Sequence, residues 1–131
     1  MMARGNKRLR VSGKKKMEET MIATNPPRPS EEIFESFGKI TSDILMQHAK
    51  LRMAGSGVLG LTYVAAGKYD AFFDYTLEPW DIAAGLLMVK EAGGNIIDIE
   101  TGSEKDKDIV YSGKVLAAND GIFEKVRKII K

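Results

Sequence analysis

Short apolar runs alternate with segments of helical periodicity along most of this chain. Ile33, Phe37, Ile40 and Ile44 recur at helical spacing, whereas the run that begins at Ala71 is short, apolar and typical of a strand. Parallel neighbouring strands need a crossover between them, so this alternation predicts an α/β fold with a layered, mixed and largely parallel sheet flanked by helices. A chain of 131 residues with 44% hydrophobic residues supports one core, and we therefore expect a single domain over residues 1–131.

Turn and cap signals divide the chain into expected elements. Strands are expected at Lys7–Val11, Glu19–Thr24, Leu51–Met53, Ala71–Tyr75, Asn95–Ile99, Ile109–Tyr111 and Val115–Ala118. Helices are expected from Ser30, from Gly55 to Gly67, from Pro79 to Gly93, and after Asn119 and Asp120. The charged loop 101–108 is expected to be solvated.

The charge balance and the missing cysteines limit the classes of function. Twenty basic and eighteen acidic residues leave a net charge of +2, which does not by itself indicate nucleic-acid binding. The absence of cysteine excludes disulfides and thiolate metal sites, and no apolar run is long enough to cross a bilayer. A reducing cytoplasm and no membrane association are therefore expected.

The amino end is locally basic. A solvated edge strand with a turn explains this cluster, and a contact with RNA or an acidic partner is the alternative. Its members are Arg4, Lys7, Arg8, Arg10, Lys14, Lys15 and Lys16.

Small residues lead directly into the second expected helix. Gly55, Ser56 and Gly57 would let backbone N–H groups approach an anion at a helix terminus, which is a common way to hold phosphate. A plain turn in which Ser56 caps the helix explains the same residues. Both interpretations stay open from the residues alone.

Two aspartates lie where a ligand of an open α/β sheet would bind, beyond the carboxyl ends of strands. Asp74 ends an expected strand and could accept hydrogen bonds from substrate hydroxyls, or it could be an ordinary polar residue. Asp81 lies in the first turn of a helix, where a carboxylate is stabilising for dipole reasons alone, and it could also bind a metal ion. Magnesium needs several oxygen ligands, so a metal role for Asp81 requires others. The single histidine, His48, is expected at the surface near a helix end rather than as a catalytic base.

Four segments in the same order and at the same spacing resemble the inositol monophosphatase family. They are Arg52–Gly57, Tyr63–Gly67, Asp70–Asp74 and Pro79–Gly94. The resemblance implies the C-terminal domain of the family's layered α-β-α-β-α fold and magnesium-dependent hydrolysis of an inositol, polyol or sugar monophosphate.

The same resemblance assigns roles to individual residues. It implies that Asp81 is a metal ligand, that the backbone of Gly55, Ser56 and Gly57 binds the substrate phosphate, and that Asp74 contacts polyol hydroxyls. Glutamate is more usual than aspartate at the position of Asp74, and alanine is more usual at the position of Gly57. The first departure shortens the substrate contact, and the second leaves the N–H group in place.

Only the second half of a family member is matched. The upstream glutamate and the Asp-Pro-Ile/Leu-Asp-Gly-Thr/Ser motif, which supply most metal ligands in the family, do not occur in this sequence. We therefore expect no catalytic residue on this chain, no activity from the chain alone, and a missing N-terminal half as a partner. A fragment or gene remnant and one half of a split enzyme both fit, and the opening residues 1–5 suggest a truncated or interrupted reading frame.

Three hypotheses follow. The first is a domain of a magnesium-dependent phosphatase that acts on a small polyol phosphate, as a homo-oligomer. The second is a non-catalytic interaction module in an RNA or transcription complex, which the resemblance implies for bacterial members and which the basic amino end suits. The third is an orphan domain whose unpartnered apolar face promotes self-association.

Overall fold

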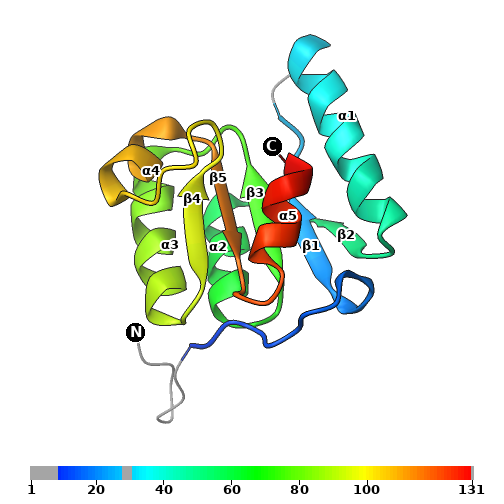
Figure 1. The fold of residues 1–131 in the computed structure, drawn as a ribbon. Helices are drawn as coiled ribbons and strands as arrows, with labels where there is room; N and C mark the ends of the chain where they lie inside the picture. Colours follow the sequence, from blue (N-terminus) through cyan, green and yellow to red (C-terminus); the bar gives the residue numbers. More distant parts are fainter. Residues whose placement is uncertain (1–8, 28–30, 131) are drawn as a thin grey trace.

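In the computed structural model, residues 9–27 and 31–130 are described, with the side chains of residues 31–33 excepted, and they form a layered α/β structure (Figure 1). The strands are β1 (Met21–Thr24), β2 (Lys50–Met53), β3 (Ala71–Asp74), β4 (Asn95–Asp98) and β5 (Val115–Ala118). The helices are the short 3-10 turn η2 (Met17–Glu19), α1 (Glu31–Met46), α2 (Gly57–Ala65), α3 (Pro79–Glu91), α4 (Asp106–Ser112) and α5 (Phe123–Ile130).

The strands form one mixed sheet in the order β2-β1-β3-β5-β4. β1 is parallel to β2 and β3, whereas β5 is antiparallel to both β3 and β4. Strands β1 to β4 therefore all end at the same edge of the sheet, which we call the carboxyl edge, and we call the opposite edge the amino edge. The expected fold class, a mixed and largely parallel sheet flanked by helices, is confirmed.

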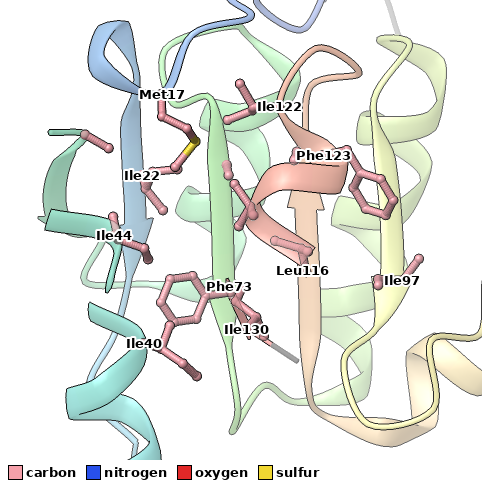
Figure 2. Packing of buried hydrophobic residues seen from close by; sticks show 14 of the residues in the cluster. Met17, Ile22, Ile40, Ile44, Phe73, Ile97, Leu116, Ile122, Phe123 and Ile130 are labelled. Atoms are coloured by element: carbon pink, nitrogen blue, oxygen red, sulfur yellow. The ribbon is translucent and has the colours of Figure 1, made fainter. Parts of the chain in front are cut away.

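Helices cover both faces of the sheet. On one face, α1 and α5 pack over buried side chains that include Ile44, Phe73 and Leu116 (Figure 2). On the other face, α2 and α3 lie side by side over a second buried cluster that includes Leu61 and Phe72 (Figure 1). Because α2 follows β2 and α3 follows β3, both helices begin at the carboxyl edge.

Two glycines allow α2 and α3 to approach their neighbours closely. A Cβ atom on Gly60 would overlap the ring of Phe72, at 2.5 Å from its Cδ1 atom, and one on Gly85 would overlap the side chain of Leu61. The sequence therefore places small residues where α2 meets the sheet and where α3 meets α2.

Several sequence-based expectations are wrong in the described residues. The expected strand Ile109–Tyr111 and the last three residues of the expected loop 101–108 belong to helix α4, which ends where Gly113 adopts a φ of 74°. The residues before β1 form η2, so the strand begins at Met21 and not at Glu19. Of the expected strand at residues 7–11, residues 7 and 8 lie outside the described residues, and residues 9–11 form no strand.

The reason is local for residues 109–111 and tertiary for residues 9–11. Apolar residues at 109 and 110 read equally well as one turn of a helix, and two aspartates in the first turn favour the helix. Residues 11–16 cross the amino edge instead of pairing along it, with Val11 donating one backbone hydrogen bond to Ala92 at 3.0 Å (Figure 1). Ser30, the expected start of the first helix, lies outside the described residues.

No helix in residues 9–27 and 31–130 has both the length and the apolar content needed to cross a membrane.

Candidate functional site

The turn between β2 and α2 presents backbone donors at the carboxyl edge. Gly55 has a φ of 84°, a left-handed conformation that favours glycine, and its N–H donates to Asn25 Oδ1 at 2.7 Å. Ser56 caps α2, because its Oγ accepts the N–H of Leu59 at 3.1 Å. Within the described part of the chain, the N–H groups of Ser56, Gly57 and Val58 have no acceptor.

Both of the interpretations that the sequence left open apply to this turn. Ser56 is a helix cap, as the structural interpretation requires, and the amides that follow it are free to bind an anion. The Gly55 N–H differs from the other three amides, those of Ser56, Gly57 and Val58, since it already has an acceptor in Asn25. An anion at this turn would therefore meet Ser56 and Gly57 before Gly55.

Asp74 is buried at the end of β3, with 3% of its surface exposed. Its Oδ1 accepts the N–H of Thr76 at 2.9 Å, and its Oδ2 accepts a hydrogen bond from Asn25 Nδ2 at 3.2 Å. Both oxygens thus have donors within the protein. Oδ2 accepts one hydrogen bond and keeps a second lone pair, so a substrate hydroxyl that reaches it need not displace Asn25.

Asp81 lies in the first turn of α3, two residues after Pro79. Its side chain is partly exposed, and none of the described residues donates a hydrogen bond to its carboxylate or pairs with it. Trp80 beside it is 68% exposed. Asp81 therefore differs from Asp74, because its oxygens are open to an external partner.

The beginnings of α2 and α3 are in contact. A Cβ atom on Gly57 would overlap the side chain of Leu77, which lies in the segment between β3 and α3. The turn that carries the free amides of Ser56 and Gly57 is therefore packed against the segment that leads to Asp81. The dipoles of the two helices add positive potential at this part of the carboxyl edge.

A complete magnesium site is not built from the residues described here. They contain no group of three or more histidine, cysteine, aspartate or glutamate side chains that could hold a metal ion. Magnesium prefers an octahedral set of oxygens, so these residues do not fit the ion by themselves. The free carboxylate of Asp81 fits the role of one ligand among several.

Two other ionisable residues, Tyr75 and His48, are not part of this arrangement. Burial raises the pKa of Tyr75, the residue after Asp74, from 10.0 to about 12. Its ring packs edge-on against Phe73, with the ring centroids 6.1 Å apart. His48 is exposed, and it lies two residues before β2, so it belongs to the amino edge.

Two residues of this arrangement are absent from the sequence-based candidates. Asn25 reads as a turn residue because two prolines follow it, and Leu77 reads as a loop residue. No local signal marks either one, since their partners lie far away along the chain. An asparagine directly after a buried strand is the only indication that the sequence offers for Asn25.

Comparisons with known proteins find similar sequences over most of this chain. The sequence model described as "Inositol monophosphatase family" matches residues 2–131. The chain is 36% identical to the Inositol-1-monophosphatase of Caulobacter vibrioides over 120 residues, which is 92% of this chain and 46% of that protein. It is 39% identical to the Nus factor SuhB of Pseudomonas aeruginosa over 124 residues, which is 93% of this chain and 44% of that protein.

A solved structure is similar over the same part. The extragenic suppressor protein suhB from Bartonella henselae superimposes with a TM-score of 0.85 at 34% sequence identity, over 97% of this chain and 48% of that chain. The chain therefore spans about half the length of the relatives that it matches.

Proposed function

This chain belongs to the inositol monophosphatase family, and from that premise we propose that it supplies the phosphate-binding half of a metal-dependent phosphomonoesterase for a polyol or sugar phosphate. The proposal treats residues 1–131 as one domain that works together with a complementary segment. That segment corresponds to the half of the relatives that this chain does not span.

One observation carries the proposal. The two helices that begin side by side at the carboxyl edge bring unused backbone donors and an unused carboxylate to the same part of the molecule. A phosphate monoester bound to a metal ion needs both kinds of group: N–H donors for its oxygens and carboxylates for the cation.

Each candidate residue has a role in the proposal. The N–H groups of Ser56 and Gly57 bind phosphate oxygens, and Gly55 shapes the turn that presents them. Asp81 is one ligand of the magnesium ion, and the other ligands come from the complementary segment. Asp74 accepts a polyol hydroxyl on the lone pair of Oδ2 that its bond to Asn25 leaves unused.

The residues of this chain bind and orient the substrate rather than transfer protons. When bound, magnesium supplies the chemistry by lowering the pKa of a water molecule and offsetting charge on the leaving oxygen. The helix dipoles of α2 and α3 favour the anionic phosphate, and the hydrogen bond from Gly55 to Asn25 holds the turn in place before the substrate arrives.

The complementary segment would cover an exposed apolar surface of this chain. Four large apolar side chains on α2 and α3 are exposed: Val58, Leu59, Trp80 and Leu87. Without a partner, such side chains promote self-association, so the proposal also accounts for the expected formation of oligomers by this chain.

Two measurements test the metal assignment. The chain would be co-expressed with the N-terminal half of the Caulobacter vibrioides relative, and phosphate release from inositol monophosphate would be compared for wild type and Asp81→Asn. Paramagnetic Mn²⁺ would also be added to the isotope-labelled chain, where it should broaden the Asp81 amide signal in wild type only. Asp106→Asn is a matched control, because Asp106 also lies in the first turn of a helix. Equal Mn²⁺ broadening in wild type and Asp81→Asn would contradict the assignment.

A second candidate function rests on a different observation. One relative is named a Nus factor, and the exposed residues Arg10, Lys14, Lys15 and Lys16 form a basic segment at the amino edge. We propose as the alternative a non-catalytic contact with RNA in a transcription complex. Binding of a short RNA that weakens steeply with salt would support it, and salt-independent binding would contradict it.

A further inference from the structure

A side-chain amide and a carboxylate lie side by side at the carboxyl edge. Asn25 follows β1 directly, and Asp74 is the last residue of the neighbouring strand β3. Asn25 Nδ2 donates a hydrogen bond to Asp74 Oδ2, with 3.2 Å between the two atoms. Asn25 is partly exposed, whereas Asp74 is buried. The pair therefore joins an amide that solvent reaches to a carboxylate that is almost fully enclosed.

The other contacts of the two residues fix their orientation. Asn25 Oδ1 accepts the N–H of Gly55 at 2.7 Å, so the amide oxygen and nitrogen cannot exchange places. Asp74 Oδ1 accepts the N–H of Thr76 at 2.9 Å, and this contact holds the carboxylate through its other oxygen. The facing atoms, Asn25 Nδ2 and Asp74 Oδ2, are thus held together before any ligand arrives.

Each of the facing atoms keeps one unused position for a hydrogen bond. An amide nitrogen carries two N–H groups, and one of those on Asn25 has no acceptor in the described residues. A carboxylate oxygen has two lone pairs, and Asp74 Oδ2 uses one of them. One donor and one acceptor therefore remain, on two atoms that are 3.2 Å apart.

A vicinal diol matches this arrangement. A hydroxyl group both donates and accepts, so one hydroxyl of a diol can accept from the Asn25 amide while its neighbour donates to the Asp74 carboxylate. The hydrogen bond to the carboxylate is charge-assisted and therefore among the stronger kinds. Hydroxyls on adjacent carbon atoms can reach both protein atoms at once, whereas hydroxyls on distant carbon atoms can reach only one.

The corresponding pair at the amino edge has no such capacity. Asn119 donates to Ser12 Oγ at 2.7 Å and to the backbone oxygen of Lys14 at 3.2 Å, so both of its N–H groups are used. Asp70 has a cation nearby, because Lys14 Nζ lies 3.8 Å from its carboxylate. In the part of the chain that the structure describes, no basic side chain pairs with Asp74. The carboxyl edge is therefore the one of the two that keeps a donor and an acceptor for a ligand.

We propose that Asn25 is a further substrate-binding residue, which binds a vicinal diol of the polyol together with Asp74. This assignment rests on the proposed function, since it takes the substrate to be a polyol phosphate and Asp74 to accept one of its hydroxyls. Asn25 adds the donor that the neighbouring hydroxyl needs. The pair therefore selects polyols whose hydroxyls lie on adjacent carbon atoms.

The test compares two diols of equal composition in solution without any metal ion. One is the cis cyclohexanediol with hydroxyls on adjacent carbon atoms, and the other is the cis cyclohexanediol with hydroxyls on opposite carbon atoms. Each would be titrated into the isotope-labelled full chain, and the side-chain amide signals of Asn25 would be followed by NMR. The adjacent diol should bind about fivefold more tightly, the scale of one additional hydrogen bond. Equal affinities in wild type would overturn the proposal.

Asn25→Ala removes the donor and should abolish the preference for the adjacent diol. The ratio of the two affinities is decisive, because a variant that only loosens this edge of the sheet would weaken both diols equally. For this variant, the backbone amide signal of Thr76 replaces the lost side-chain signal as the probe. A fivefold preference that persists in Asn25→Ala would overturn the proposal.

An exchange of the two residues provides a second comparison. Asn25→Asp keeps an acceptor for the Gly55 N–H but removes the donor, so the preference should be lost. Asn25→Asp/Asp74→Asn restores one donor and one acceptor on exchanged sides. Because a diol can bind in either sense, the exchange should recover the preference to within about twofold of the wild-type value. If Asn25→Ala does not fold, this exchange decides, and a folded double variant without the preference overturns the proposal.

Asn119→Ala is the matched control. Asn119 is also an asparagine that follows a strand and contacts a buried cluster, but it lies at the amino edge. This variant should be less stable in thermal unfolding and should keep the full preference for the adjacent diol. An equal loss of preference in Asn119→Ala and Asn25→Ala would overturn the proposal, because the loss would then follow from lowered stability.

The outcomes are distinguishable from those of the proposed function. The Mn²⁺ measurement at Asp81 does not involve Asn25, so it can fail while the diol preference holds. If Asp74→Ala binds both diols as wild type does, Asp74 accepts no hydroxyl, and that part of the proposed function fails together with the role of Asn25. If the preference is lost in Asp74→Ala but persists in Asn25→Ala, the role of Asn25 alone is overturned.

Discussion

An aspartate and an asparagine meet at each edge of the sheet: Asp74 with Asn25 at the carboxyl edge, and Asp70 with Asn119 at the amino edge. Both aspartates are almost fully buried, at 3% and 1% exposure. Asp70 comes directly before the four-residue strand β3, and Asp74 is its last residue. The two edges nevertheless leave very different groups open to solvent.

At the amino edge, every polar group of the cluster is used inside the protein. Asp70 accepts hydrogen bonds from Ser12 Oγ and from the N–H of Met21, the second at 2.7 Å, and Lys14 Nζ lies 3.8 Å from it. Asn119 donates to Ser12 Oγ at 2.7 Å and accepts the N–H of Ile122 at 3.0 Å. These contacts hold the segment that crosses the edge.

At the carboxyl edge, the buried pair supports groups that remain free. Asp74 and Asn25 satisfy each other, while the amides of Ser56 and Gly57 and the carboxylate of Asp81 have no partner in the described residues. An aspartate and an asparagine at an edge of the sheet therefore do not by themselves make a binding site. What distinguishes the two edges is whether a segment of the same chain covers the polar groups.

The largest expected effect tests whether the amino edge is structural and the carboxyl edge binds a ligand. Asp70→Ala leaves the buried N–H of Met21 without an acceptor and should lower the free energy of unfolding by about 3 kcal/mol. Its phosphate affinity should match that of wild type. Asp74→Ala should cost about 2 kcal/mol and should also weaken phosphate binding. Urea unfolding measures the free energy of unfolding, and a titration with inorganic phosphate measures the affinity. An equal loss of affinity in Asp70→Ala and Asp74→Ala would contradict the difference in role between the two edges.

The next effect concerns pH at the carboxyl edge. Burial raises the pKa of Tyr75 to about 12, whereas the unfolded chain titrates near 10.0, so the folded state favours the neutral phenol. The stabilisation is fully present below pH 10.0 and is lost as the pH rises through about 12, by up to about 2 kcal/mol. Urea unfolding across this range should show a steeper decline for wild type than for Tyr75→Phe. Parallel curves for the two proteins would show that Tyr75 ionises as freely in the folded state.

A smaller effect is expected where the first residue of α2 contacts the segment that leads to α3. Gly57→Ala places a methyl group against Leu77 and should lower the free energy of unfolding by about 1 kcal/mol, because the flexible leucine side chain can move partly aside. Gly57→Ala/Leu77→Ala should cost less than the sum of the single variants. A double-mutant cycle in urea measures this coupling, and strict additivity would mean that the two segments do not restrain each other.

The smallest effect on stability is expected at the proposed metal ligand. Asp81→Asn removes only a favourable charge at the first turn of α3 and should change the free energy of unfolding by no more than about 0.5 kcal/mol. A loss above 2 kcal/mol, the scale of an uncompensated buried group, would show that Asp81 is an internal support like Asp74. The same urea series provides the measurement.

Most elements of the fold were predictable, because their signals lie within a few residues of each other. Ser56 caps α2, Pro79 begins α3, and β5 spans the expected Val115–Ala118. The path of residues 9–16 and the helical state of residues 109–111 were not predictable. The path of residues 9–16 depends on what the rest of the chain packs against them, whereas residues 109–111 are too few for their apolar pattern to distinguish a strand from a helical turn.

The candidate site was predictable only in part. Ser56, Asp74 and Asp81 stand out as polar residues at the ends of expected strands or the beginnings of helices, and their assigned roles remain predictions. Asn25 could not be found in this way, because its partners lie 30 and 49 residues away along the chain.

The sequence by itself determined most of the helices and strands of this chain and many of the residues that end them, because periodicity, caps and turn residues act between near neighbours. It also placed Asp70 and Asp74 at the two ends of one strand. Only the tertiary structure decided that a segment of the chain covers the first and that the second supports an open edge. The reason is physical: a buried hydrogen bond depends on which strand lies beside which, and that order is set by packing over the whole sheet.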